Sequence, residues 1–297
     1  MNIKDLEYFV TVFDEKNFSN AAIQKNVSQP TITLAIKRLE NEFGTVLFLR
    51  DHSHQRLEPT RQGQQLLVHA RKMLAELDLA KKELTQIESG KVRLGLPPII
   101  GNYYFPKISP ALFRSQLINK IDTIEAGSAV LRQNLTKGDV DIALLGSLSP
   151  VIDQTLKVDL FAKSKFKIIV SNKNPLAQKD TINFIDLKGE NFIVLDKGFV
   201  HEKALKEVSR HAHCRPKVVY LTSDIHILKS LVAENVGIGF LTESAIARTD
   251  QLHSLILLDK EQPTFYMSTA YRKSKILSYD EKSILDLVQK ELTGPDN

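Results

Sequence analysis

Cysteine is almost absent from this chain, which has one, Cys214, among 297 residues. A single cysteine excludes an intramolecular disulfide framework and any zinc site built from several cysteines, and it fits a reducing compartment. No apolar run reaches the roughly 18 residues of a membrane-spanning helix. The first residues, MNIKDLEYFV, form an amphipathic pattern with acidic side chains, unlike a signal peptide. The sequence therefore predicts a cytoplasmic protein without a membrane span.

Patterns typical of catalysis are also missing. The GSLS segment at 146–149 lacks the second glycine of a nucleophile elbow, and the GIG triplet at 237–239 lacks the third glycine of a dinucleotide-binding loop. His211, His213 and Cys214 have no second ligand pair nearby in sequence, which favours a structural role over a metal site. We expect no catalytic residue, no metal and no cofactor.

The distribution of charge gives no simple indication of a partner. The formal net charge is +5, yet residues 1–90 carry twelve basic and twelve acidic side chains, so the excess lies in residues 91–297. Net charge therefore does not indicate nucleic acid, and local placement of cations matters instead. Hydrophobic and charged contents of 42% and 25% are those of a soluble globular protein, and the length suits two or three domains.

Residues 27–44, VSQPTITLAIKRLENEFG, have the start and stop signals of one helix. Ser28 is a suitable N-cap, Pro30 is tolerated in the first turn and Gly44 favours a stop. At 100° per residue one face is apolar and the opposite face mixes polar groups, a leucine and a cation. The apolar face comprises Ile32, Ala35, Ile36, Leu39 and Phe43; the outer face comprises Pro30, Leu34, Lys37 and Asn41. The outer face suits contact with base edges in a DNA major groove.

Elements on either side complete a DNA-binding pattern. An apolar stripe predicts a first helix closed by Asn17, and Ser19 then predicts a cap for a short helix at 20–25. With the 28–44 helix these form a helix-turn-helix, although ordinary three-helix packing has the same periodicity. Residues 46–49 and 55–58 predict a two-stranded wing whose tip includes His52 and His54.

A long helix is predicted after the wing. Thr60 is a suitable cap, and apolar residues then recur at alternating steps of four and three, as in a coiled coil. They are Leu66, Ala70, Met73, Leu77, Ala80, Leu84 and Ile87. A helix from 60 to 89 is roughly 45 Å long. We expect it to pair with its copy in a second chain, and Ser89 and Gly90 to form a linker.

From residue 92 short apolar strands alternate with helices, a pattern typical of parallel sheets covered on both faces. Strands are predicted at 92–96, 120–124, 140–145, 166–171, 192–195, 217–221, 237–241, 254–258 and 265–271. Helices are predicted near 102–115, 128–137, 200–211, 224–235 and 280–292. Two strand-helix-strand-helix-strand runs, 92–146 and 166–241, suggest two lobes with a cleft where helix N-termini face an anion.

Several runs of residues resemble one family over the whole chain. They are FVTVFDEKNFSNAAIQKNVSQPTITLAIKRLENEFGTVLFLR at 9–50, EPTRQG at 58–63, EAGS at 125–128, GDVDIALLG at 138–146 and VAENVGIGFL at 232–241. These segments resemble LysR-type transcriptional regulators, and GLPPIIGNYYFP at 95–106 is similar to the family's regulators of malolactic fermentation in lactic acid bacteria. The resemblance implies an α/β fold class: an N-terminal winged helix-turn-helix, a long linker helix and a two-lobed, periplasmic-binding-protein-like effector domain.

The resemblance also implies domain limits, partners and a mechanism. Residues 1–59 would bind DNA, 60–90 would dimerise, and 91–297 would bind an effector, with lobe I at about 91–162 and 267–297 and lobe II at about 163–266. A small organic acid, malate included, would change DNA bending or recruitment of RNA polymerase by a homo-oligomer, a dimer of dimers. The alternative is a small-molecule-binding module or an α/β enzyme that the N-terminal unit merely dimerises.

Candidate site residues follow from the helix faces and the resemblance together. Base-edge contacts are predicted for Gln29, Pro30, Thr31, Thr33, Leu34 and Lys37, and backbone contacts for Ser28, Arg38, Arg50 and Arg61. Effector contacts are predicted for Ile99, Ile100, Ser128, Thr222 and Ser223. The chain departs from the family at Leu34, often basic or polar elsewhere, and at Pro97 and Ile99, where many members have a hydroxyl side chain.

Overall fold

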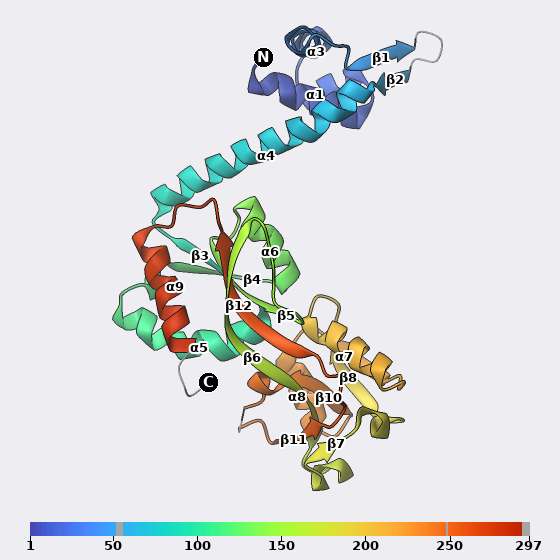
Figure 1. The fold of residues 1–297 in the computed structure, drawn as a ribbon, viewed down its shortest axis with the longest axis vertical. Helices are drawn as coiled ribbons and strands as arrows, with labels where there is room; N and C mark the ends of the chain where they lie inside the picture. The colour runs from blue at the N-terminus through green and yellow to red at the C-terminus, as the bar shows by residue number, and fades with distance from the viewer. Residues whose placement is uncertain (52–55, 248, 293–297) are drawn as a thin grey trace. The chain divides into compact units, whose positions relative to one another are not determined.

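The computed structural model describes residues 1–51, 56–247 and 249–292, and it divides into two units, Met1–Glu88 and Ser89–Asn297 (Figure 1). His52 and His54, at the predicted tip of the wing, lie outside the described residues, and so does the side chain of Arg50. Each unit has its own hydrophobic core and is considered by itself.

The N-terminal unit is a helix-turn-helix with a two-stranded wing. Its elements are α1 (Ile3–Glu15), α2 (Phe18–Gln24), α3 (Gln29–Phe43), β1 (Phe48–Asp51), β2 (Arg56–Pro59) and α4 (Arg61–Ser89). The apolar stripes of the first three helices meet in one cluster around Phe9, Ile32 and Leu39, all fully buried. Phe48 of β1 contacts the ring of Phe9, which fixes the wing against this core.

Two details of these helices differ from the sequence-based prediction. Asn17, not Ser19, caps α2, because its side chain accepts hydrogen bonds from the Ser19 and Asn20 N–H groups. Phe43 was expected in the core but is 46% exposed. It is the last helical residue before Gly44, whose left-handed backbone ends the helix.

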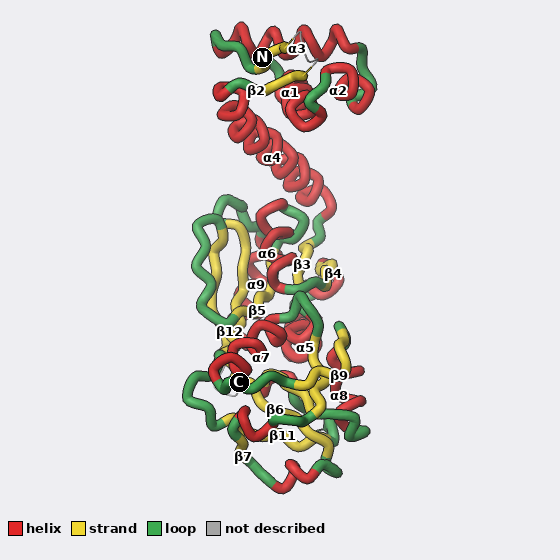
Figure 2. Tube along the Cα trace, turned by 90° about the vertical axis from the view of Figure 1, so that its right-hand side faces the viewer, coloured by secondary structure: helices red, strands yellow, loops and turns green. Residues whose placement is uncertain are grey.

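Helix α4 is one continuous helix (Figure 2). Thr60 starts it as predicted, since its hydroxyl accepts a hydrogen bond from Gly63 N–H at 2.9 Å. Ala70 of the heptad seam is buried, but further along the seam Met73, Leu84 and Ile87 are 42%, 65% and 77% exposed. The start of the predicted seam therefore packs on the core of the N-terminal unit, whereas Met73, Leu84 and Ile87 remain exposed apolar side chains.

The C-terminal unit is built on one mixed sheet in two parts. Lobe I holds β3 (Val92–Leu96), β4 (Ile121–Glu125), β5 (Ile142–Ser147), β12 (Thr264–Arg272) and the first part of β6 (Leu156–Ser171), with helices α5 (Pro98–Arg114), α6 (Ser128–Lys137) and α9 (Tyr279–Leu292). Lobe II holds the second part of β6, β7 (Thr181–Ile182), β8 (Asn191–Leu195), β9 (Lys217–Thr222), β10 (Ile238–Thr242) and β11 (Leu252–Leu257), with helices α7 (Val200–His211) and α8 (Ile225–Ala233). Short 3₁₀ helices occur at Ile118–Lys120, Pro175–Gln178, Phe184–Leu187 and Glu243–Ala245.

The long strand β6 joins the two lobes (Figure 1). Its residues up to Lys165 pair with β12, and from Phe166 it pairs with β10. Both pairings are antiparallel, as are β12 with β5 and β11 with β6. The predicted parallel pairing holds for β3 with β4 and β5 and for β8 with β9 and β10, whereas the antiparallel pairings of β6 and β12 were not predicted.

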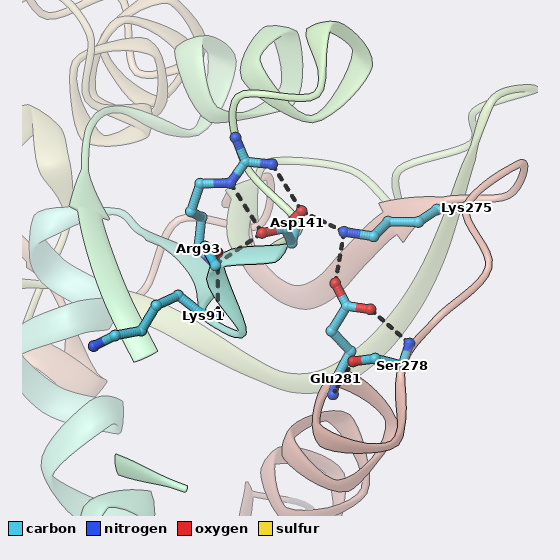
Figure 3. Close-up of polar contacts among 7 residues, drawn as sticks. Lys91, Arg93, Asp141, Lys275, Ser278 and Glu281 are labelled. Atoms are coloured by element: carbon cyan, nitrogen blue, oxygen red, sulfur yellow. Dashed lines mark hydrogen bonds and ion pairs between the residues drawn. The ribbon is translucent and has the colours of Figure 1, made fainter. Parts of the chain in front are cut away.

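A buried network of ion pairs connects strands and a helix of lobe I (Figure 3). Asp141, fully buried before β5, accepts hydrogen bonds from the Arg93 backbone N–H and guanidinium at 2.9 to 3.0 Å. Lys275 also contacts this carboxylate, and its ammonium lies 2.6 Å from Glu281 of α9. Although burial raises the pKa of Asp141, hydrogen bonds from Arg93 and Lys275 outweigh it and hold the pKa below its ordinary value. The network ties β3 and β5 to the C-terminal helix.

Candidate DNA-binding helix and effector cleft

The N-terminus of α3 is ordered by its own hydroxyl groups. Ser28 is the N-cap and its hydroxyl accepts from Thr31 N–H at 3.4 Å, while the Ser28 and Thr31 hydroxyls lie 2.8 Å apart. Gln29 and Pro30 occupy the first turn and are exposed. The capping geometry leaves this turn of the helix facing solvent, as contact with base edges requires.

Further along α3 the outward face is open. Leu34 is 55% exposed and Lys37 is also exposed, whereas Thr33 is half-buried. Lys37 has no ion-pair partner among the residues that the structure describes. Together with Thr33 and Glu40 it borders a shallow groove of about 170 Å³ beside β1. Arg61, predicted to contact the DNA backbone, is exposed at the start of α4.

Arg38 has a structural partner that the sequence did not predict. Its guanidinium donates to the buried carboxylate of Asp5 at 2.5 and 3.3 Å. Burial raises the pKa of Asp5, but the hydrogen bonds from Arg38 and from Asn2 N–H outweigh it and leave the pKa lowered. The pair joins α3 to α1, so Arg38 orients the exposed helix whether or not it also contacts a phosphate.

In the C-terminal unit three helix N-termini surround one cleft, which is lined by Pro97, Pro98, Ile99, Ile100, Gly127, Ser128, Gly198, Phe199, Val200, His201 and Phe265. Helices α5, α6 and α7 begin here, behind the carboxyl ends of β3, β4 and β8. None of the three has a side-chain cap. Their first-turn N–H groups and helix dipoles therefore favour an anion at this point.

The two lobes touch across this cleft. A Cβ atom placed on Gly127 would lie 2.9 Å from the carbonyl oxygen of Gly198, so only glycine allows the approach seen here. Behind the cleft the Lys229 ammonium of α8 contacts the Tyr103 hydroxyl of α5 and the Asp250 carboxylate, both at 2.5 Å. The remaining cavity is about 20 Å³, space for roughly one water, so a carboxylic acid enters only if the lobes separate.

His201 is a cleft residue that the sequence did not reveal. It is 3% exposed, and its Nε2 accepts a hydrogen bond from Thr242 N–H at 3.3 Å. The rings of Phe166 and Phe265 pack against it, and burial lowers the pKa of His201 to about 3. The imidazole is therefore neutral, and because Nε2 accepts, its proton lies on Nδ1. His201 and Ser128 are the polar side chains in the lining of this cleft, and the other lining residues are glycines and apolar side chains.

The predicted effector residues separate into two groups. Ile99, Ile100 and Ser128 line the cleft, although the Ser128 hydroxyl already accepts from Gly146 N–H at 2.9 Å. Thr222 and Ser223 do not line it. Ser223 was expected to start a helix, but the N-cap of α8 is Asp224, whose carboxylate accepts from His226 N–H and repels an anion. The third helix N-terminus at the cleft is that of α7. The sequence signal for it was Gly198 followed by the predicted start of a helix.

Two absences hold for the described residues. Within residues 1–51, 56–247 and 249–292, no group of three or more His, Cys, Asp or Glu side chains is placed to hold a metal ion. Across the same ranges, no helix combines the length and apolar character that crossing a membrane requires.

Comparison with known families assigns both units. Residues 3–64 match the family described as "Bacterial regulatory helix-turn-helix protein, lysR family", and residues 85–293 match "LysR substrate binding domain". The chain belongs to the LysR family. It is a transcriptional regulator and not an enzyme, and its helix-turn-helix, long helix and α/β domain confirm the predicted fold class.

Known relatives cover nearly the full chain. A malolactic fermentation system transcriptional activator from Lactococcus lactis is 32% identical over 97% of this chain and 98% of its own length. A hydrogen peroxide-inducible genes activator from Haemophilus influenzae is 31% identical over 83% of this chain and 81% of its own length. The crystal structure of HinK, a LysR family transcriptional regulator from Pseudomonas aeruginosa, superimposes with a TM-score of 0.57 at 20% identity, covering 98% of each chain.

Proposed function

We propose that this LysR regulator binds a specific DNA sequence through the exposed face of α3 and responds to a small organic anion held between its lobes. Three uncapped helix N-termini and the buried donor His201 at one cleft support the anion most directly. Malate is the first candidate, because the Lactococcus relative is named for malolactic fermentation. The proposed effector residues are Ile99, Ile100, Ser128, Phe199 and His201.

The proposed mechanism is a change in the separation of the two lobes. The lobes are in contact at Gly127 and Gly198, so an anion between them would hold them further apart. A ligand shifts such an equilibrium only if its affinity differs between the two states. The separated form would present different surfaces to other subunits, and the regulator would then bend DNA or recruit RNA polymerase differently. We place this activity in the cytoplasm, with the chromosome.

The Haemophilus relative is named for a response to hydrogen peroxide, and the cysteine content of this chain does not favour such a response through a disulfide. An intramolecular disulfide needs two cysteines, and this chain has only Cys214. That thiol is 4% exposed and belongs to the hydrophobic core of the C-terminal unit. A buried cysteine in apolar surroundings is poorly reactive.

We propose a homo-oligomer with two kinds of contact between copies. The exposed seam of α4, Met73, Leu84 and Ile87, would pair with the same seam of a second chain. Strand β9 forms an edge of the sheet, and its Val218, Val219, Tyr220 and Leu221 are 44% to 60% exposed. A second copy covering it would remove an aggregation-prone edge. A monomeric full-length chain in sedimentation at micromolar concentration would contradict this assembly.

Replacing Lys37 with alanine is expected to weaken operator binding roughly tenfold or more, because a cation is lost from the base-reading face. The slope of log affinity against log salt should also fall by about 0.9 if Lys37 reaches a phosphate. Gel shifts with DNA flanking the gene would measure both quantities. Lys81→Ala, the same charge change on α4, is the control.

Both variants should unfold at the same temperature as the original chain, since Lys37 and Lys81 are exposed. Arg38→Ala, in contrast, should lower the unfolding temperature, because it leaves the buried Asp5 carboxylate without its cation. If the Lys37 and Lys81 variants bound the operator with equal affinity at fixed salt, Lys37 would not be a contact to the DNA.

A carboxylate that occupies the cleft is expected to raise the unfolding temperature of the full chain. At a concentration of about 100 times Kd it adds roughly 2.7 kcal/mol, which corresponds to about 5 °C or more for a unit of this size. Differential scanning fluorimetry with malate, citrate and succinate would test this, with the neutral dimethyl ester of malate as control. A shift with the ester equal to that with malate would exclude recognition of charge.

A further inference from the structure

A second concave site lies where β6 passes from one lobe to the other. It is lined by Tyr104, Lys107, residues 163–167, Glu243, Ser244, Ile256, Leu257, Gln262 and Thr264. Its volume is about 810 Å³, within the range of small-molecule sites. It shares no lining residue with the effector cleft. The site is therefore a separate cavity and is far larger than the closed cleft.

Positive charge is concentrated on this cavity. Four of its lining residues are lysines, at 107, 163, 165 and 167, and one is acidic, Glu243. Glu243 is already paired with Lys167 at 2.7 Å, while Lys163 and Lys165 are exposed. Lysines at every second position of one strand repel one another unless an anion lies between them. The charge balance of the lining thus favours a ligand with more than one negative charge.

Aromatic rings contact two of these lysines, and the cavity lining also supplies a neutral hydrogen-bond donor. The Lys107 and Lys163 ammonium groups lie over the rings of Tyr104 and Tyr266, at 5.1 and 5.4 Å from the ring centres. Tyr104 is 6% exposed, and burial raises the pKa of its phenol, so the hydroxyl remains a donor. Ser164, 8% exposed, accepts from Ser244 N–H at 3.1 Å and fixes the floor of the cavity. Ring contacts therefore place the Lys107 and Lys163 ammonium groups, and burial places the phenol of Tyr104.

We propose that this cavity binds a small organic polyanion, a molecule carrying two or more phosphate or carboxylate groups. Its charges would meet Lys107, Lys163 and Lys165, and its carbon skeleton would lie near Ile256 and Leu257. This site shares no lining residue with the effector cleft, so its occupancy is tested without any ligand in the cleft.

The position of the cavity couples it to the cleft. Lys165 is the last residue of β6 that pairs with β12, and Phe166 is the first that pairs with β10. Phe166 lines the cavity, and its ring lies 5.3 Å from that of His201, which lines the cleft. A polyanion that binds this part of β6 changes the affinity of the cleft for its ligand. By thermodynamic linkage, the ligand in the cleft changes the affinity for the polyanion by the same factor.

Isothermal titration calorimetry of the full chain with pyrophosphate and with citrate, in magnesium-free buffer, tests the site. The expected result is saturable binding of at least one of them at one molecule per chain. Lys163→Ala with Lys165→Ala should weaken that binding about tenfold or more, because two charge-assisted contacts are lost. Lys188→Ala with Lys203→Ala, two exposed lysines of lobe II outside the cavity, should leave it unchanged. Preference for pyrophosphate or for citrate identifies the anionic group.

Three results would overturn the proposal. The first is no saturable binding of either anion to the original chain. The second is an equal loss in both double variants, which would show a response to net charge alone. The third is loss of operator affinity in the Lys163 and Lys165 variant without any polyanion present, which would make these lysines DNA contacts. None of these results depends on the identity of the effector in the cleft.

Discussion

Replacing Asp141 with asparagine is expected to lower the free energy of unfolding of the C-terminal unit by about 3–5 kcal/mol, since a buried ion pair loses one partner. Asp141 is fully buried and receives hydrogen bonds from both the backbone and the guanidinium of Arg93. The amide would remove the carboxylate that Arg93, which is 19% exposed, contacts, and it would leave Lys275, which is 9% exposed, with Glu281 (Figure 3). Urea denaturation followed by far-UV circular dichroism measures the change.

Asp122→Asn is the matched control for this variant. Asp122 lies on the neighbouring strand β4 and is 59% exposed, 3.5 Å from Lys91. An exposed ion pair contributes about 1 kcal/mol or less, so this variant should remain close to the original stability. If the two variants lost equal stability, the network of Figure 3 would contribute no more to the free energy of unfolding than an exposed ion pair does.

The second large effect expected is a dependence of stability on pH that originates from His201. The folded pKa is about 3, below the ordinary value of 6.5, so the unfolded chain binds a proton that the folded chain does not. Stability from this residue is complete above the ordinary pKa and is lost as pH falls towards the folded pKa, at about 1.4 kcal/mol per pH unit. Between about pH 6.5 and 5, where most carboxylates stay ionised, the loss is about 2 kcal/mol.

His201→Gln should flatten this dependence between about pH 6.5 and 5, because glutamine does not titrate and its carbonyl oxygen can still accept from Thr242 N–H. His226→Gln is the control, since His226 is exposed on α8. Chemical denaturation at several pH values in this interval would show the slope. A slope that is the same in the original chain and in the His201 variant would mean that the imidazole is not held neutral by burial.

Local patterns were sufficient to predict most helices and strands. The 3.6-residue period and Ser28 predicted α3, and the short apolar runs predicted β3, β5 and β8 within a few residues. The first part of β6, Leu156–Lys165, was missed, although the alternation of polar and apolar residues in LKVDL is typical of a half-buried strand. It is a strand because β12, about a hundred positions later, pairs with it. Such pairing is not encoded in a local window.

Part of the candidate cleft lining was predicted, where local signals and the family resemblance agreed. Ile99, Ile100 and Ser128 follow strand ends at helix starts, and all three line the cleft. His201 sits in the first turn of α7, and the rings of Phe166 and Phe265, distant in the sequence, pack against it in its buried position. The contact between Lys275 and Asp141 joins residues 134 positions apart, so no spacing rule could have found it. The positions of these residues depend on contacts between segments that are far apart in the sequence.

The crossing of β12 has a consequence for synthesis on the ribosome. Lobe I needs β12 between β5 and β6, yet β12 is made only after the whole of lobe II. Lobe II is one continuous stretch of chain, from the second part of β6 to β11, so it can form while lobe I still has a missing central strand. Pairings between distant segments form slowly and expose apolar edges meanwhile. A nascent chain stalled before Thr264 should therefore be sensitive to protease around β5, and release of residues through Arg272 should end that sensitivity.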